Sequence, residues 1–285
     1  MPKGLALNIG LNTVDPKHYQ GWSGALNACE ADARDMAAIA RSRKFTARML
    51  LTRQATRAAV LSAIGRAAKT LKRGDIFLLT YSGHGGHVPD LNDEEPDRQD
   101  ETWCLFDGEL IDDEIYTALG RLARGVRVLM LSDSCHSGTV SRAMYYAARA
   151  ASPEVAATRS YSSTGASGPP RFRSMPPDVA LRTYRAHKTM YDRIQRSLKP
   201  NAQARVGAAV LLLSGCQDNQ ESADGDFNGL FTGTLLRVWK EGTFSGSHRD
   251  FHRAIVRLMP PDQTPNYFTV GAPDRTFERQ RPFTV

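Results

Sequence analysis

The sequence predicts an α/β protein with a mostly parallel central β-sheet and helices on both faces of that sheet. Segments of strand composition alternate with segments of helix composition along the first 132 residues. The strand segments are apolar along their whole length, which is typical of parallel strands that are buried on both faces. The chain has 285 residues, of which 41 % are hydrophobic, so it is long enough to bury one large core.

The expected elements follow a strand–helix rhythm until residue 132. We predict strands at 4–12, 47–52, 75–83 and 126–132, separated by helices at 28–43, 56–72 and 112–125. In the first helix acidic residues come early and basic residues late, as the helix dipole favours. In the second helix the apolar residues share one face, and Thr56 suits the N-cap. After an arginine-rich stretch with a helix near 178–198, we expect a strand at 208–216, helices near 230–241 and 247–258, and a last strand at 266–270.

Charge is unevenly distributed along the chain, although the net charge is only +7. Residues 90–114 contain twelve acidic residues and one basic residue, whereas residues 141–206 contain twelve basic and three acidic residues. The basic segment carries no recognisable nucleic-acid motif, so we do not expect a nucleic-acid partner. No apolar run is long enough for a membrane span, and the first residues lack a signal-peptide pattern. Four widely spaced cysteines without a CxxC pair indicate free thiols, and we expect a cytoplasmic protein.

Two of the predicted strands end in reactive residue types. The strand at 75–83 leads into His84 and Gly85, and the strand at 126–132 leads into Cys135. Because the carboxyl ends of parallel strands meet at one edge of a sheet, the histidine and the cysteine face the same cleft. An imidazole can take the proton of a thiol, and thiolate attack on a carbonyl creates an oxyanion that needs N–H donors. We predict Cys135 as nucleophile, His84 as base, and the backbone N–H groups of Gly85 and Cys135 as oxyanion donors.

Other interpretations of these residues stay open at this stage. His87 and His136 are rivals of His84 for the role of base. The same histidines together with Cys135 could ligate zinc, although their spacing fits no established zinc pattern. Cys135 could also be a buried structural cysteine, and His84 a hydrogen-bonded turn histidine.

Several motifs together resemble one peptidase family. They are TYSGHGG at 80–86, DETWCLFDGELIDDEI at 100–115, SDSCHSGT at 132–139, LLSGCQDNQESADG at 212–225, GLFT at 229–232 and QTPNY at 263–267. These stretches resemble the caspase-like clan of cysteine peptidases, and the metacaspase branch most closely. The resemblance implies a caspase-like sandwich and a single peptidase domain over 1–285. It divides the domain into a first half with the dyad (1–139), a basic insertion or activation linker (140–207) and a second half (208–285).

The resemblance also implies a specificity. Caspases have Gln-Ala-Cys where this chain has Asp-Ser-Cys, and metacaspases use an acidic S1 pocket that accepts Arg or Lys. The positions that match this pocket are Asp32 and Asp133, with Ser82 and Cys29 at lesser positions, and Asp224 lies in a loop expected to border the substrate. A guanidinium that enters a confined pocket must be met by a carboxylate. The alternatives are a turn-capping role for Asp133 and a first-turn helix position for Asp32.

The acidic run DLNDEEPDRQDE at 90–101 suggests a site for a hard cation, because clustered carboxylates repel one another unless a cation neutralises them. Many metacaspases require calcium, and the matching ligands here are Asp97, Asp112 and Asp113, with Asp100 as the alternate to Asp97. A further acidic ligand expected after the nucleophile is not evident, since Arg142 stands in that region. A solvated acidic loop is the alternative.

The sequence therefore predicts a monomeric cysteine endopeptidase that cleaves protein substrates after Arg or Lys. We expect a zymogen that is activated by calcium, by cleavage in the insertion, or by both, through self-cleavage or another protease. Candidate bonds in the insertion follow Arg142, Arg149, Arg159, Arg171 and Arg173. The alternatives are a helical subdomain with a basic face for the insertion, and a noncatalytic caspase-like scaffold that binds partners for the whole chain.

Overall fold

A six-stranded sheet forms the centre of the molecule. The computed structural model describes residues 2–92, 98–134, 172–199, 201–216, 223–225, 227–261 and 263–285. The strand order is β2-β1-β3-β7-β8-β9, and all neighbours are parallel except β8 and β9. The strands are β1 (Gly4–Gly10), β2 (Phe45–Leu51), β3 (Ile76–Ser82), β7 (Arg127–Asp133), β8 (Ala209–Ser214) and β9 (Asn266–Gly271). The predicted α/β class with a mostly parallel sheet is confirmed.

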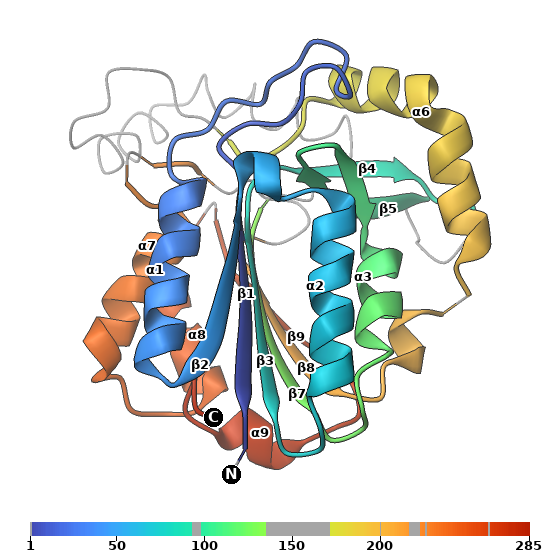
Figure 1. Ribbon diagram of the computed structural model, residues 1–285. Helices are drawn as coiled ribbons and strands as arrows, with labels where there is room; N and C mark the ends of the chain where they lie inside the picture. The colour runs from blue at the N-terminus through green and yellow to red at the C-terminus, as the bar shows by residue number, and fades with distance from the viewer. Residues whose placement is uncertain are drawn as a thin grey trace.

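Helices cover both faces of this sheet. The α-helices of the described residues are α1 (Cys29–Ser42), α2 (Arg57–Thr70), α3 (Asp112–Leu119), α6 (Pro177–Ser197), α7 (Leu230–Trp239), α8 (His248–Val256) and α9 (Arg275–Arg279). Helices α1, α7 and α8 lie on one face, and α2 and α3 lie on the other (Figure 1). The hydroxyl of Thr56 accepts a hydrogen bond from the N–H of Ala59, which is the N-cap that the sequence predicts for α2.

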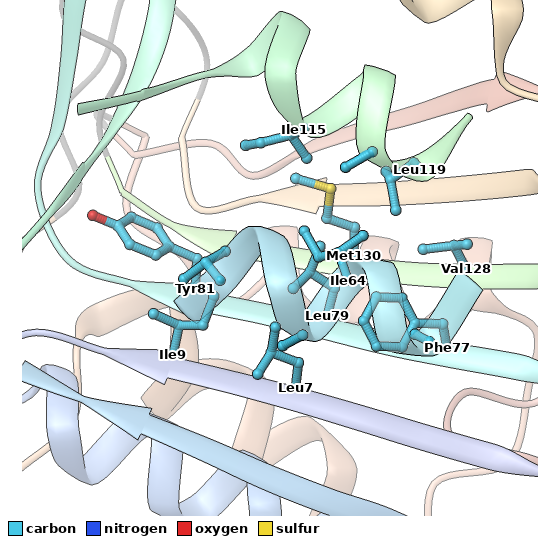
Figure 2. Packing of buried hydrophobic residues seen from close by; sticks show 14 of the residues in the cluster. Leu7, Ile9, Ile64, Phe77, Leu79, Tyr81, Ile115, Leu119, Val128 and Met130 are labelled. Carbon is cyan, nitrogen blue, oxygen red and sulfur yellow. The ribbon is translucent and has the colours of Figure 1, made fainter. Parts of the chain in front are cut away.

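The core explains why the central strands are apolar at every position. Along β3, Phe77, Leu79 and Tyr81 pack with α2 and α3, whereas Ile76 and Leu78 pack with α1, α7 and α8. Figure 2 shows the first of these two layers, where Ile64 of α2 and Ile115 and Leu119 of α3 lie over the strands. Successive side chains of a strand point to opposite faces, so two covered faces require apolar residues throughout.

A second, antiparallel sheet was not predicted. It consists of β4 (Gly85–Pro89), β5 (Gln99–Leu105) and β6 (Gly108–Ile111). These strands carry glycines, His87 and several acidic residues, and β4 and β6 are short, so they lack the apolar pattern that marked the central strands. The helix predicted at 112–125 is shorter in the structure, where α3 ends at Leu119.

The chain segments before and after the insertion share the central sheet. Strand β7 precedes the insertion and pairs with β8, which follows it. The second part of the insertion forms α6, which packs against β4, and Tyr191 of α6 hydrogen-bonds to His18 at 2.8 Å. This part of the insertion is therefore a packed helix and not an open linker. Within the described ranges, no helix is long and apolar enough to cross a membrane.

Truncation of Leu79 to alanine should destabilise the protein strongly, because this side chain is fully buried in the middle of the sheet. We expect a loss of about 2–5 kcal/mol in the free energy of unfolding, measured by urea denaturation. Leu258, which is half exposed, provides the matched control. Leu258→Ala should change stability by no more than about 0.5 kcal/mol. Equal effects of the two substitutions would contradict the described core.

Candidate active site

The carboxyl ends of β3 and β7 form the edge of the sheet from which the chain continues to the predicted catalytic residues. The two strands are adjacent and parallel, and their last residues, Ser82 and Asp133, are partners in the register. His84 follows two residues after Ser82. Cys135 follows two residues after Asp133 and lies outside the described residues, so its role as nucleophile stays a prediction.

The His84 side chain is buried and held in one orientation. Its Nε2 lies 3.0 Å from the carbonyl oxygen of Gly24, and its ring contacts the indole of Trp22 at 4.6 Å between centroids. Because a carbonyl can only accept, the proton is on Nε2 and Nδ1 is an acceptor. Within the described part of the chain, Nδ1 has no hydrogen-bond partner. Burial lowers the pKa of His84 to about 4, so the ring is neutral at neutral pH and can accept a proton.

Gly24 is a site residue that the sequence did not reveal. Its φ of 52° lies in the left-handed region, and a Cβ at this position would come within 2.9 Å of the His84 ring. A glycine here lets the loop between β1 and α1 approach the histidine closely enough for its carbonyl to accept the Nε2 proton. No local sequence pattern indicates this contact, because it joins residues 60 positions apart.

Asp32 is the first carboxylate of a buried acidic pocket. It lies in the first turn of α1 and is 1 % exposed. One oxygen accepts from the Ser82 hydroxyl at 2.7 Å, and the other accepts from the Gly229 N–H at 3.0 Å. Burial raises the pKa of Asp32, while Arg173 opposes that change. Asp32 is therefore a pocket residue and not only a first-turn helix acid.

Asp133 and Asp224 complete the pocket from two other elements. Asp133 Oδ2 accepts from the backbone N–H of Thr232 at 3.0 Å and from its hydroxyl at 2.7 Å. Asp224 Oδ2 accepts from the backbone N–H of Asn27 at 2.7 Å. Since α1 begins at Cys29, this last contact ties the segment after β8 to the start of α1.

The guanidinium of Arg173 fills this pocket. Its Nη2 lies 2.8 Å from Asp32 Oδ2 and 3.0 Å from Asp224 Oδ1, and its Nη1 lies 2.9 Å from Asp133 Oδ2. Nη1 also donates to the Ser82 hydroxyl at 2.9 Å. Arg173 is 0 % exposed, and the cavity that Asp32 and Asp133 line in part measures only about 10 Å³. The pocket therefore has no room for a second basic side chain while Arg173 is in place.

Two further residues shape the space around the guanidinium. A Cβ at Gly229 would lie 2.4 Å from Arg173 Nη2, so only glycine fits this position. The Cys29 thiol is fully buried beside the pocket, and burial raises its pKa well above the usual range. Cys29 is consequently a neutral packing residue here and not a reactive thiol.

The backbone around Arg173 lies along the predicted catalytic edge. The Gly85 N–H donates to the Arg173 carbonyl oxygen at 2.9 Å, and the Met175 N–H donates to the Gly85 carbonyl at 2.8 Å. On the other side, Phe172 forms an antiparallel bridge with Ala223. The sequence predicts Gly85 as an oxyanion donor. In the structure its N–H binds the carbonyl oxygen of Arg173, the residue whose side chain occupies the acidic pocket.

The predicted calcium ligands lie in a different region. Asp100 is on β5, Asp112 and Asp113 begin α3, and Asp97 lies outside the described residues. Partial burial, together with the charges of Glu101, Asp113 and Asp100, raises the pKa of Asp112 well above its usual range. Among the described residues, no set of three or more His, Cys, Asp or Glu side chains is arranged to hold a metal ion.

Comparison with known proteins identifies the family. A model of the caspase domain matches residues 3–277. The chain belongs to the caspase-domain family of cysteine peptidases. Metacaspase-1 of Coccidioides immitis is 30 % identical over 257 residues, covering 82 % of this chain and 53 % of that protein. Metacaspase-1 of Schizosaccharomyces pombe is 30 % identical over 266 residues, covering 84 % and 59 % respectively. This caspase domain therefore spans little more than half the length of those two relatives.

Solved structures agree with this assignment. The crystal structure of a protein from Geobacter sulfurreducens is 60 % identical, with a TM-score of 0.89, and covers 100 % of this chain and 99 % of that chain. Caspase-1 from Spodoptera frugiperda gives a TM-score of 0.53 at 8 % identity, covering 95 % and 86 %. The second likeness shows the fold alone. The resemblance drawn from the sequence motifs is confirmed at the level of family and fold.

The protonation of His84 should make stability depend on pH. The folded-state pKa of about 4 lies below the unfolded value of 6.5. The neutral ring therefore stabilises the fold above about pH 6.5, and this contribution is lost as the pH falls towards 4. Between about pH 7 and pH 5, wild type should lose about 2 kcal/mol more than His84→Gln in urea unfolding. Equal pH dependence in the two proteins would show that His84 is not buried as a neutral ring.

Proposed function

We propose that this protein is a cysteine endopeptidase that cleaves proteins after arginine or lysine, with Cys135 as nucleophile and His84 as base. One observation carries the proposal, namely the arginine that fills a pocket of three buried carboxylates next to His84 and Gly85. A buried charge needs opposite charges and hydrogen bonds, so this pocket favours a guanidinium and disfavours an acidic side chain. Membership of the caspase-domain family supports the cysteine peptidase activity in this proposal.

The chemistry follows from the residues at the edge of the sheet. The unprotonated Nδ1 of His84 would accept the proton of the Cys135 thiol. The thiolate would then attack the backbone carbonyl carbon of the Arg or Lys residue at P1. The Gly85 N–H, which already donates to a carbonyl oxygen, would stabilise the oxyanion together with the Cys135 N–H. His84 would then return the proton to the leaving amine.

The natural setting of this activity is part of the proposal. We expect a cytoplasmic monomer made as a zymogen, with protein substrates that present basic residues. Cys29, Cys104 and Cys216 are buried free thiols, which suits a reducing compartment. Processing within the basic insertion, by the protein itself or by another protease, would accompany activation.

Peptides that differ only at P1 test the specificity. We expect peptides with Arg or Lys at P1 to be hydrolysed with a kcat/KM at least about 100-fold above peptides with Asp, because the carboxylates would repel an acidic side chain. Fluorogenic peptides in parallel assays provide the measurement.

Three variants accompany this assay. Cys135→Ala should abolish hydrolysis of every peptide, and Asp133→Asn should lower kcat/KM for Arg substrates because it removes one partner of the guanidinium. Asp178→Asn, at an exposed position of α6, is the matched change and should have no effect. Preferred cleavage after Asp, or full activity without Cys135, would refute the proposed function.

We also propose that calcium binds at the acidic cluster around Asp112. The support is its donor chemistry, since carboxylates of Asp100, Asp112 and Asp113 lie close enough for their charges to interact. A bound cation would relieve this repulsion, and ligands from outside the described residues, such as Asp97, would complete the coordination.

Calcium should raise the melting temperature and the activity of the protein, and EGTA should reverse both effects. Asp112→Asn should lose the thermal response, because it removes a proposed ligand, whereas Asp178→Asn should keep it. Differential scanning fluorimetry measures the response without reliance on activity. An identical thermal response of wild type and Asp112→Asn would rule out this location.

A further inference from the structure

The segment Phe172–Met175 lies across the active site in the manner of a bound substrate. Its arginine side chain fills the acidic pocket, and the carbonyl of the same residue accepts from Gly85. Phe172, before the arginine, bridges to Ala223 in antiparallel fashion, which is how peptides add a strand to an enzyme edge. The side chain of Arg173, its carbonyl and the backbone before it therefore make the contacts expected of the P1 residue of a substrate.

The residue after the arginine lies beside the predicted base. Ser174 forms a parallel bridge with Gly85, the residue after His84. Its backbone carbonyl acts to raise the pKa of His84, against the larger effect of burial. In peptide hydrolysis the amine that leaves belongs to the residue after P1, and it must receive a proton from the acid–base group. Cleavage after Arg173 would make Ser174 that residue.

We propose that the Arg173–Ser174 peptide bond is the site at which this protein cleaves itself, within one molecule, and that Arg173 excludes external substrates until that cleavage. The inference rests on the proposed function and selects one of the five candidate bonds that the sequence predicts in the insertion. The other four follow Arg142, Arg149, Arg159 and Arg171, which lie outside the described residues.

The reaction balances with water as the only co-reactant. The Cys135 thiolate sulfur bonds to the Arg173 carbonyl carbon, and the bond from that carbon to the Ser174 nitrogen breaks. The Ser174 amine receives its proton from His84. Water then hydrolyses the thioester, which restores the thiol and leaves Arg173 with a new carboxylate. One peptide bond and one water become one carboxylate and one amine.

The chain after the proposed cut is firmly held. Met175 is fully buried in a cluster with Val14, Tyr19 and Cys104, and α6 follows directly. A Cβ at Gly86 would meet the Met175 side chain at 2.6 Å, which shows how closely the two pack. The new N-terminus at Ser174 should therefore stay in place, and departure of the Arg173 side chain would empty the acidic pocket.

The two products should also stay together. Strand β7 belongs to fragment 1–173 and β8 to fragment 174–285, and these strands pair in the middle of the sheet. Separation would expose the apolar residues of both layers, so cleavage converts one chain into a two-chain complex whose native mass rises only by that of one water molecule.

Intact mass and N-terminal sequencing over time test the inference, with wild type, Cys135→Ala, Arg173→Ala and Arg171→Ala in parallel. Wild type should yield fragments 1–173 and 174–285, which separate only under denaturing conditions. Arg171→Ala, the matched control two residues away, should be cleaved at the same bond. Cys135→Ala should stay intact, and Arg173→Ala should lose this cut by at least about 10-fold in rate.

Arg173→Ala leaves three buried acids without their cation and can fail to fold, so Arg173→Lys provides the second variant. It keeps the charge and should be cleaved after residue 173. The rate constant should not change over a dilution of about 100-fold, because the bond and the dyad belong to one molecule. In wild type, hydrolysis of an external Arg peptide should begin with a lag that matches the appearance of the Ser174 terminus.

The outcomes separate this inference from the proposed function. Hydrolysis of Arg peptides without any new N-terminus at Ser174 overturns the inference and leaves the proposed function standing. The inference is also overturned, and the proposed function still stands, if cleavage at another bond removes the lag. The same conclusion follows if the rate constant of self-cleavage rises in proportion to protein concentration. Absence of hydrolysis of any peptide, with the chain intact, contradicts the proposed function itself and the inference with it.

Discussion

One buried ionic contact organises this edge of the molecule. The guanidinium of Arg173 lies within 3.0 Å of carboxylate oxygens from Asp32, Asp133 and Asp224, and all four residues are excluded from water. Three carboxylates at this depth would repel one another without a cation, and an arginine without carboxylates would be left desolvated. Each side of the contact therefore requires the other, and the pocket is stable as a buried structure only while a basic side chain fills it.

The fold makes this contact possible by bringing distant segments to one place. Asp32 comes from the first turn of α1, Asp133 from the end of β7, and Asp224 from the segment after β8. Parallel pairing of β3 with β7 sets Ser82 beside Asp133, and Gly229 leaves the room that the guanidinium needs. The same pairing brings His84 and Gly85 to this edge, so specificity and chemistry depend on one sheet register. A shift of that register by one residue would turn these side chains to the other face.

Much of this arrangement could be predicted from the sequence, for identifiable reasons. The central strands are apolar on both faces, and the amphipathic helices are long, so local patterns sufficed to place them. Asp32, Asp133 and Ser82 could be placed in a pocket because the motifs around them match a known family. The antiparallel sheet of β4, β5 and β6 could not be predicted, because its strands are partly polar and β4 and β6 are short. Arg173 could not be singled out either, since it is one of twelve basic residues in 141–206 and its partners are far away in the sequence. Gly24 and Thr232 likewise act through tertiary contacts that leave no local pattern.

The central claim is that the chain places its own arginine in the acidic pocket. A crystal structure of the Cys135→Ala variant, in which the chain should remain uncut, tests it most directly. The account predicts electron density for the Arg173 guanidinium between Asp32, Asp133 and Asp224, with its carbonyl oxygen on the Gly85 N–H. A pocket filled by solvent, with Arg173 at the surface, would contradict it.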